Sequence, residues 1–311
     1  MVLGIDFGGT KIALAAADAA DGVRLGSATV PTLAEEGAQA GLARAVHAAT
    51  ALLERVAPGR PLAAVGCSTI GIPGDQGVEL APNIPGWADL ALARELGAAF
   101  GGAVIRLATD VKAAGRVEAR QGALRGADPG IYLNLGTGLA VAIIVGGEVV
   151  AGRNGASGEI GYNLRTVADV GLGPGERELL EDAVSGKALL TRAMAVMPQA
   201  DGARDVFAGA DSDPALARLL EGFTAELAFH LVNLTIAVDP ERIAVGGGMV
   251  RSWAALHGPL RRALDAAVPY PPELVRAAFP FDAPLLGALA LGLEAAREMV
   301  PADAEPDAAA V

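Results

Sequence analysis

The stretch 3-LGIDFGGTKIAL-14 decides how the chain begins to fold. Apolar residues fill 2–7 and 11–17, and each run has the composition of a buried strand. Gly8-Gly9 lies between them and predicts a turn at positive φ. Glycine also lets backbone N–H groups approach an anion without a Cβ in the way. The stretch therefore fits either an ordinary hairpin or a phosphate-binding turn.

A second stretch, 131-IYLNLGTGLAVAII-144, repeats this arrangement. Here too an apolar strand runs into glycine and threonine before a second apolar strand, so the two stretches form a weak internal repeat. A third glycine run, Gly246-Gly247-Gly248, follows the apolar residues 243–245. One such turn is explained as well by turn statistics, but the set predicts a phosphate clamp in a shared cleft.

The composition restricts the class of protein. The chain has 311 residues, 52% of them hydrophobic, which is enough for two domains with their own cores. A net charge of −12 argues against general nucleic-acid binding, which needs clustered cations. The single cysteine, Cys67, cannot form an intrachain disulfide, and we expect an inert buried thiol there. Since neither a signal peptide nor a membrane span is recognisable, we expect a cytoplasmic protein without a membrane partner.

Strand and helix patterns alternate along the chain, which predicts an α/β architecture with parallel strands. The expected strands, besides those quoted above, lie in 63–73, 103–110 and 243–250, and the expected helices in 36–57, 89–99, 111–122, 176–195 and 213–237. The tail 300–311 has no periodicity, and we expect it to be flexible.

Polar residues at the ends of these elements are candidates for chemistry. Asp110 ends a strand, where its carboxylate serves either as a helix N-cap or as a general base. Glu159 lies among glycines in 155–163 and is either a hydroxyl acceptor or an exposed loop residue. Asn83 is placed in 81-APNIPGW-87, which also reads as a simple turn.

The order of these motifs resembles the ROK family of repressors, open reading frames and sugar kinases. The motifs are Asp-Phe-Gly-Gly-Thr-Lys, Asn-Ile-Pro-Gly-Trp, an Asp ending a strand, Leu-Gly-Thr-Gly, Gly-Glu-Ile-Gly and the late triple glycine, and the resemblance covers residues 2 to about 295. It implies an actin-like, hexokinase-like (ribonuclease H-like) duplicated two-domain fold with an interdomain cleft. The expected domains are 1–112, completed by a helix at 285–299, and 113–284.

The resemblance also implies a role for each motif residue. Asp110 would be the base that takes a proton from a sugar hydroxyl, usually the 6-hydroxyl, with ATP and Mg²⁺ as cofactors. The expected sugar-binding residues are Asn83, Gly86, Thr109, Asp110, Glu159, Tyr162 and Glu181. The expected nucleotide-side residues are Asp6, Gly8, Gly9, Thr10, Lys11, Gly136, Thr137, Gly138, Gly246, Gly247 and Gly248, with Asp6 also near Mg²⁺.

Departures from the family pattern lead to further expectations. Tyr162 stands where relatives carry a zinc-binding histidine, and 163–180 holds no cysteine, so we expect no zinc site. We expect Tyr162 to fill the place of that histidine and apolar contacts to hold the loop instead. Those contacts would come from Val167, Val170, Leu172, Leu179 and Leu180. Thr109 replaces an asparagine, and Leu139-Ala140-Val141-Ala142 replaces a glycine-rich run.

We therefore expect a hexose kinase acting on glucose or an amino hexose, with a sugar and a nucleotide as partners. The resemblance implies a homodimer. The alternative is a catalytically weak sugar sensor of the same fold, because the lost glycines and the lost zinc site leave that possibility open. A DNA-binding repressor is disfavoured by the acidic charge and by the start of the chain at the phosphate motif.

Overall fold

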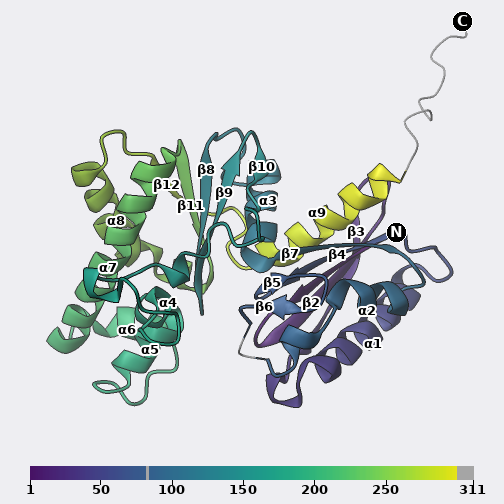
Figure 1. Ribbon diagram of the computed structural model, residues 1–311, viewed down its shortest axis with the longest axis horizontal. Coiled ribbons are helices and arrows are strands. Elements are labelled where there is room, and N and C mark those ends of the chain that lie inside the picture. The colour runs from purple at the N-terminus through teal and green to yellow at the C-terminus, as the bar shows by residue number, and fades with distance from the viewer. Residues whose placement is uncertain (82–83, 300–311) are drawn as a thin grey trace, which may run out of the picture. The chain divides into compact units, whose positions relative to one another are not determined.

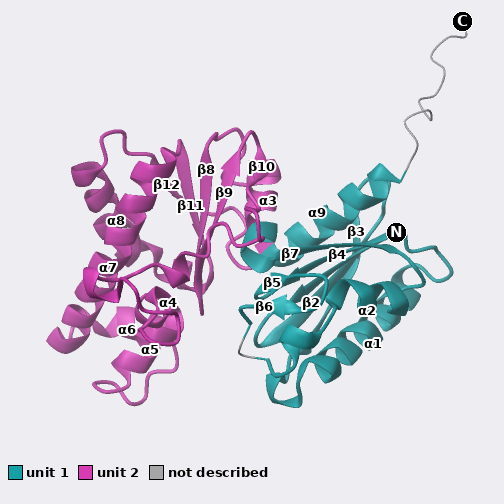
Figure 2. Ribbon diagram, viewed as in Figure 1, with its two compact units in different colours: residues 1–113, 284–311 teal, residues 114–283 magenta. Residues whose placement is uncertain are grey.

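The computed structural model describes residues 1–81 and 84–299. It divides into two compact units, residues 1–113 with 284–311 and residues 114–283 (Figure 2). Asn83 and the tail 300–311, for which we made predictions, lie outside the described residues. No helix within the described residues is long and apolar enough to cross a membrane.

Unit 1 is built on a five-stranded sheet of order β3-β2-β1-β4-β7 (Figure 1). β1 pairs antiparallel with β2 and parallel with β4, and β4 pairs parallel with β7. The bounds are β1 Val2–Phe7, β2 Lys11–Ala17, β3 Arg24–Pro31, β4 Ala64–Thr69 and β7 Val104–Thr109. A short hairpin, β5 Ile72–Pro73 with β6 Val78–Glu79, follows β4.

Helices cover both faces of this sheet because its strands are apolar on both sides. Leu3, Ile5 and Phe7 of β1 share a core with α1, Ala38–Val56, and α2, Leu92–Ala99. On the other face, Ala13, Ala15 and Ala17 of β2 pack against Leu285 and Leu289 of α9, Ala283–Glu298. This helix approaches so closely that a Cβ on Gly66 would lie 1.8 Å from the carbonyl oxygen of Ala288.

Unit 2 repeats the same sheet topology with the order β10-β9-β8-β11-β12. β8 pairs antiparallel with β9 and parallel with β11, as β1 does with β2 and β4. The strands are β8 Gly130–Leu135, β9 Leu139–Val145, β10 Glu148–Val149, β11 Arg242–Gly246 and β12 Glu273–Arg276. The helices are α4 Leu180–Ala183, α5 Gly186–Ala193, α6 Ala203–Gly209, α7 Pro214–Val238 and α8 Trp253–Ala267, and α3 Asp110–Gln121 begins in unit 1 and continues into unit 2.

Two predictions about local structure were wrong. Gly8 and Gly9 do not adopt positive φ; the close approach of the Lys11 carbonyl, 2.9 Å from a Cβ built on Gly8, constrains Gly8 instead. The helix expected at 176–195 is two short helices, α4 and α5. It is interrupted because the Ser185 hydroxyl accepts a hydrogen bond from Ala188 N and starts α5 as its N-cap.

Candidate active site

The carboxyl ends of β1, β4 and β7 meet at one edge of the unit 1 sheet because these strands are parallel. Asp6 lies at this edge and accepts a hydrogen bond of 2.8 Å from the Ser68 hydroxyl. Burial raises the pKa of Asp6 to about 6, although Ser68 and Lys11 act in the opposite direction. The carboxylate is therefore kept in surroundings that lack enough polar groups to solvate it fully.

The Gly-Gly turn after Asp6 is tied at its base and open at its tip. Gly8 N donates to the Lys11 carbonyl over 3.1 Å, and the Thr32 hydroxyl donates to the Gly8 carbonyl over 2.6 Å. Gly9, Thr10 and Lys11 are exposed. Of the residues in 1–81 and 84–299, none has a heavy atom within 4 Å of a Cβ built on Gly9, outside its chain neighbours. The tip is thus accessible to a ligand.

Asp110 is the first residue of α3, and it does not act as the N-cap. The capping bond comes from Thr109, whose hydroxyl accepts from Lys112 N over 3.2 Å while its side chain is almost fully buried. An Asp110 carboxylate oxygen accepts from Val111 N over 2.9 Å. The N-cap interpretation of Asp110 was therefore wrong, and the residue that replaces the family's asparagine performs that task.

Trp87 anchors the segment that carries Gly86. Its indole is 1% exposed and donates from Nε1 to the Thr69 hydroxyl over 3.2 Å, at the end of β4. Its ring packs against Phe7, with ring centroids 5.4 Å apart. Gly86 is exposed and has a φ of 78°. Two motifs that are distant in sequence, around Phe7 and Trp87, are thereby joined at the same sheet edge.

The corresponding turn of unit 2 is held on several sides. Gly136 N donates to the Gly138 carbonyl over 3.1 Å, and the Gly136 carbonyl accepts from Gly186 N over 2.7 Å. Leu139 N donates to Glu181 Oε2 over 2.8 Å. A Cβ on Gly138 would lie 2.5 Å from that same carboxylate oxygen, so glycine is needed here for close approach.

Glu159, Tyr162 and Glu181, all predicted to bind sugar, gather next to this turn. A short 3-10 turn, Ile160–Tyr162, joins the first two and packs between β9 and α4, where a Cβ on Gly161 would lie 2.9 Å from the Leu139 carbonyl oxygen. Burial and then the charges of Glu181 and Glu159 raise the pKa of the Tyr162 phenol. Burial also raises the pKa of Glu181. At neutral pH the Tyr162 phenol therefore keeps its proton.

A cavity of about 430 Å³ opens beside the unit 2 turn. Gly136, Thr137 and Gly248 line it, which brings parts of the second and third glycine runs together. The same cavity is lined by three cations that were not predicted from the motifs, Lys187, Arg204 and Arg251. A signal was available, because each cation follows a glycine by one to three residues at the start of a helix or 3-10 turn.

Comparison with known proteins identifies the family. The ROK family model matches residues 2–295. The chain belongs to the ROK family. A kanosamine kinase of Amycolatopsis mediterranei is 32% identical over 96% of this chain and 98% of its own length. A ROK hexokinase structure from Thermus thermophilus is 31% identical, with a TM-score of 0.77 over 96% of this chain and 99% of that chain.

A ROK family glucokinase structure from Streptomyces griseus, in complex with glucose and AMPPNP, is 28% identical, with a TM-score of 0.75 over 94% of this chain and 99% of that chain. These matches confirm the predicted family, the hexokinase-like two-domain fold and a relationship to sugar kinases. They do not test the individual site residues, which stay predictions.

The loop of this ROK protein between Tyr162 and α4 is not held as we expected. Val167 is 89% exposed, and Val170 and Leu172 are also exposed, so the prediction that they pack was wrong; only Leu180 is fully buried. Within 1–81 and 84–299 no group of at least three His, Cys, Asp or Glu residues is arranged to hold a metal ion. Arginine side chains make the principal side-chain contacts of the loop instead.

Proposed function

We propose that this ROK protein transfers a phosphoryl group from ATP to a hydroxyl of a hexose or an amino hexose. The observation that carries the proposal is the unit 2 cavity, where Gly136, Thr137 and Gly248 converge with Lys187, Arg204 and Arg251. Glycine amides, a hydroxyl and cations in one cavity suit a polyphosphate, because phosphoryl transfer depends on positioning and charge neutralisation. The sugar kinases among the relatives support the same reaction.

In this proposal the cavity takes the nucleotide. Lys187 lies in the first turn of α5 and Arg204 in the first turn of α6, so both add their charge to the partial positive charge of a helix start. Arg251 packs over the Phe281 ring at 4.0 Å, which restricts the position of its guanidinium. These side chains would hold the phosphates and the adenosine. Gly9, Thr10 and Lys11 are proposed separately as nucleotide-binding residues of unit 1.

The acceptor side would use Asp110 as the general base. Because Thr109 supplies the cap of α3, the Asp110 carboxylate is not needed for that purpose. Glu159 and Glu181 would accept hydrogen bonds from sugar hydroxyls, and the neutral Tyr162 phenol would donate one. Asn83 and Gly86 are further residues that we propose to bind the sugar.

Mg²⁺ fits the donor chemistry of Asp6. A carboxylate is the ligand that Mg²⁺ takes from proteins alongside substrate phosphates and water, and the raised pKa of Asp6 means that a nearby cation would stabilise its charged form. When bound, the ion would neutralise charge on the phosphates. Asp6 would hold it, and Ser68 would orient the carboxylate through the hydrogen bond to it.

Tyr162 departs from the family pattern on the proposed sugar side, which favours a modified hexose over glucose. Thr109 departs as well, but its side chain is almost fully buried and caps α3. A site built to bond particular hydroxyl or amino groups rejects analogues that lack them. The kanosamine kinase and an N-acetyl-D-glucosamine kinase of Yersinia enterocolitica, 30% identical over 80% of this chain, are relatives named for amino sugars. An amino hexose is therefore the first acceptor to test.

The deciding experiment is ADP release from ATP with glucose, mannose, fructose, kanosamine, N-acetylglucosamine and N-acetylmannosamine. We expect turnover with at least one sugar, and Arg204→Ala should raise the KM for ATP while leaving the KM for sugar nearly unchanged. Arg94→Ala, on the exposed face of α2 in unit 1, is the control. Sugar binding without ADP release for every sugar would instead identify the protein as a sensor.

We also propose a homodimer, because the resemblance to the family implies one. Sedimentation at micromolar concentration should give about twice the 31.1 kDa mass of the chain. A monomer at that concentration would contradict the proposal.

A further inference from the structure

The loop 163–179 leaves Tyr162 and returns at α4, so it connects two elements that carry proposed sugar-binding residues. Its valines face solvent, and its internal order comes from polar contacts. The Asp169 carboxylate accepts from Arg165 N over 2.9 Å and from Thr166 N over 2.8 Å, closing a capping box. Charged side chains fix this loop to the rest of unit 2.

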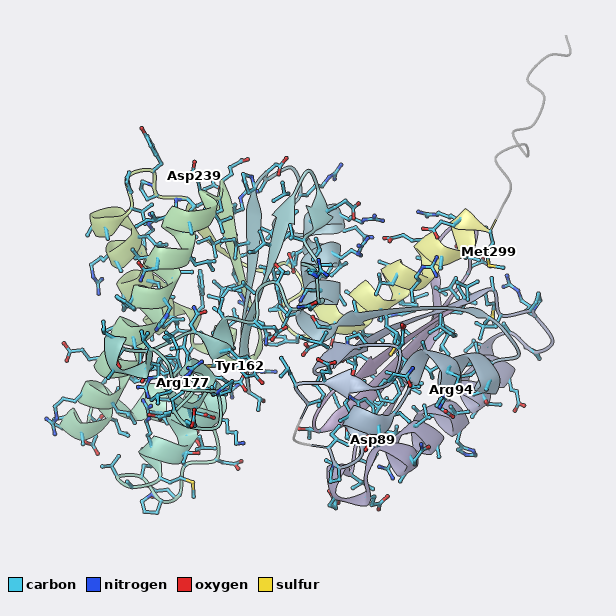
Figure 3. All side chains as sticks on the ribbon, viewed as in Figure 1. Asp89, Arg94, Tyr162, Arg177, Asp239 and Met299 are labelled. Carbon is cyan, nitrogen blue, oxygen red and sulfur yellow. The ribbon has the colours of Figure 1, made fainter. Side chains whose placement is uncertain are left out.

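Arg177 reaches back across the loop to its beginning. Nη1 donates to the Asn163 carbonyl over 3.0 Å, and Nη2 donates to the Tyr162 carbonyl over 2.5 Å. Figure 3 shows Arg177 and Tyr162 close together in unit 2. A guanidinium can bind two successive carbonyls because its donors have a fixed fork geometry, which lysine lacks. Arg177 thus holds the end of the 3-10 turn that begins after Glu159.

Arg165 ties the same loop to α7. Its Nε and Nη2 both donate to the Glu226 carboxylate, and its Nη1 donates to Glu178, the neighbour of Arg177. The side chains of Arg165 and Glu226 are 21% and 23% exposed. The hydrogen bond with Glu226 is the main cause that raises the pKa of Arg165. Removing one partner of a partly buried ion pair with two hydrogen bonds costs more stability than removing one partner of an exposed pair.

We propose that Arg177 and Arg165 are positioning residues for the acceptor sugar. Arg177 fixes the backbone that carries Tyr162 and follows Glu159, and Arg165 fixes the loop that carries Arg177 against α7. This inference rests on the proposed function, since it assumes that Glu159 and Tyr162 bind the sugar. Its consequence is that sugar affinity depends on the backbone hydrogen bonds of Arg177 and the ion pairs of Arg165, which do not involve the sugar itself.

The first test is Arg177→Met, compared with Arg177→Lys and with the control Arg94→Met. We expect Arg177→Met to raise the sugar KM roughly tenfold, as the loss of charge-assisted hydrogen bonds implies. The ATP KM should stay within twofold and the control should be unchanged. Arg177→Lys should restore little, because a single ammonium cannot span both carbonyls. Equal rises in both KM values, or none, would overturn the proposal.

The second test is a double-mutant cycle of Arg165→Met and Glu226→Met. We expect each variant to raise the sugar KM, and the double variant to raise it by clearly less than the product of the two, because one interaction is removed twice. An effect equal to that product would show that the two residues act independently. An unchanged KM in the single variants would also overturn the inference.

Hydrogen exchange separates this inference from the proposed function, because it needs no activity. In Arg177→Met, the amides of Tyr162 and Asn163 should exchange at least tenfold faster than in the wild type, while those of β8 should not change. If the wild type phosphorylates no sugar, the proposed function is refuted. Faster exchange in Arg177→Met would still support the positioning role of Arg177 in that case. Unchanged exchange together with an unchanged sugar KM in an active enzyme would refute the positioning role alone.

Discussion

The two glycine turns join equivalent strand pairs, yet their surroundings differ. The turn of unit 1 leaves Gly9 exposed, with open space around the position of a Cβ. The turn of unit 2 is backed by Glu181 and by the start of α5, and it lines a cavity. Similar sequence patterns therefore produce the same backbone topology, while the segments inserted after the strands of unit 2 form a cavity beside its turn.

The largest effect should come from Asp110, which follows β7 and lies outside both glycine-turn stretches. Asp110→Asn should lower kcat by ~10²–10⁴-fold, the contribution typical of a general base. Thr109, rather than Asp110, caps α3, so the melting temperature should change little. Steady-state kinetics and a thermal melt check both parts. Activity within threefold of the wild type would refute the role of Asp110.

The next largest effect should be a difference in stability between variants that add a side chain to each glycine turn. Gly138→Ala should lower the free energy of unfolding by about 1–3 kcal/mol, because its Cβ meets the Glu181 carboxylate that Leu139 N needs. Gly9→Val should leave it within about 0.5 kcal/mol, because its tip is open. Urea unfolding measures the difference, and equal losses would contradict the contrast between the turns.

Gly9→Val also tests ligand contact at the open turn. Because no heavy atom of residues 1–81 and 84–299, outside the chain neighbours, lies within 4 Å of a Cβ built on the exposed Gly9, a rise in the ATP KM would come from the nucleotide itself. We expect that rise, and Thr137→Val should produce one in unit 2, where a hydroxyl lining the cavity is lost. A rise confined to the sugar KM in either variant would show that its turn contacts the sugar and not the nucleotide, contrary to the proposal.

A smaller, pH-dependent effect should come from Asp6. Its pKa of about 6 in the folded state exceeds the ordinary value of 3.8, so the folded state binds the proton more tightly than the unfolded state. Stability from this group is fully present below the ordinary pKa and is lost as pH rises through 6. Asp6→Asn should therefore gain stability relative to the wild type between pH 4 and 7 in thermal melts. A difference independent of pH would contradict this assignment.

The smallest effect should follow metal chelation. The loop 163–179 is held by Arg165 and Arg177, so EDTA should change neither the melting temperature nor the sugar affinity once Mg²⁺ is resupplied for catalysis. Calorimetry and sugar titration check this expectation. Stoichiometric zinc in the purified protein would show that the loop has a metal ligand after all.

The sequence determined a great deal of this protein. Apolar runs on either side of glycine turns predicted both strand pairs, because the alternation of apolar strands with turn residues is a local property. The order of the motifs predicted the family and the fold, and the comparisons confirmed both. It also pointed to Glu159, Tyr162 and Glu181, which the structure brings together in unit 2.

Other features depended on contacts between residues that are distant in sequence. The cap of α3 went to Thr109 because the strand enters the helix one residue earlier than the sequence suggested. Lys187, Arg204 and Arg251 lie far apart along the chain and meet only at the cavity. Apolar side chains such as Val167 and Val170 were expected to fix the loop, yet Arg165 binds Glu226, 61 residues away. The glycine before each cation is a local signal for that cation alone, whereas packing in three dimensions decides which side chains meet at such separations.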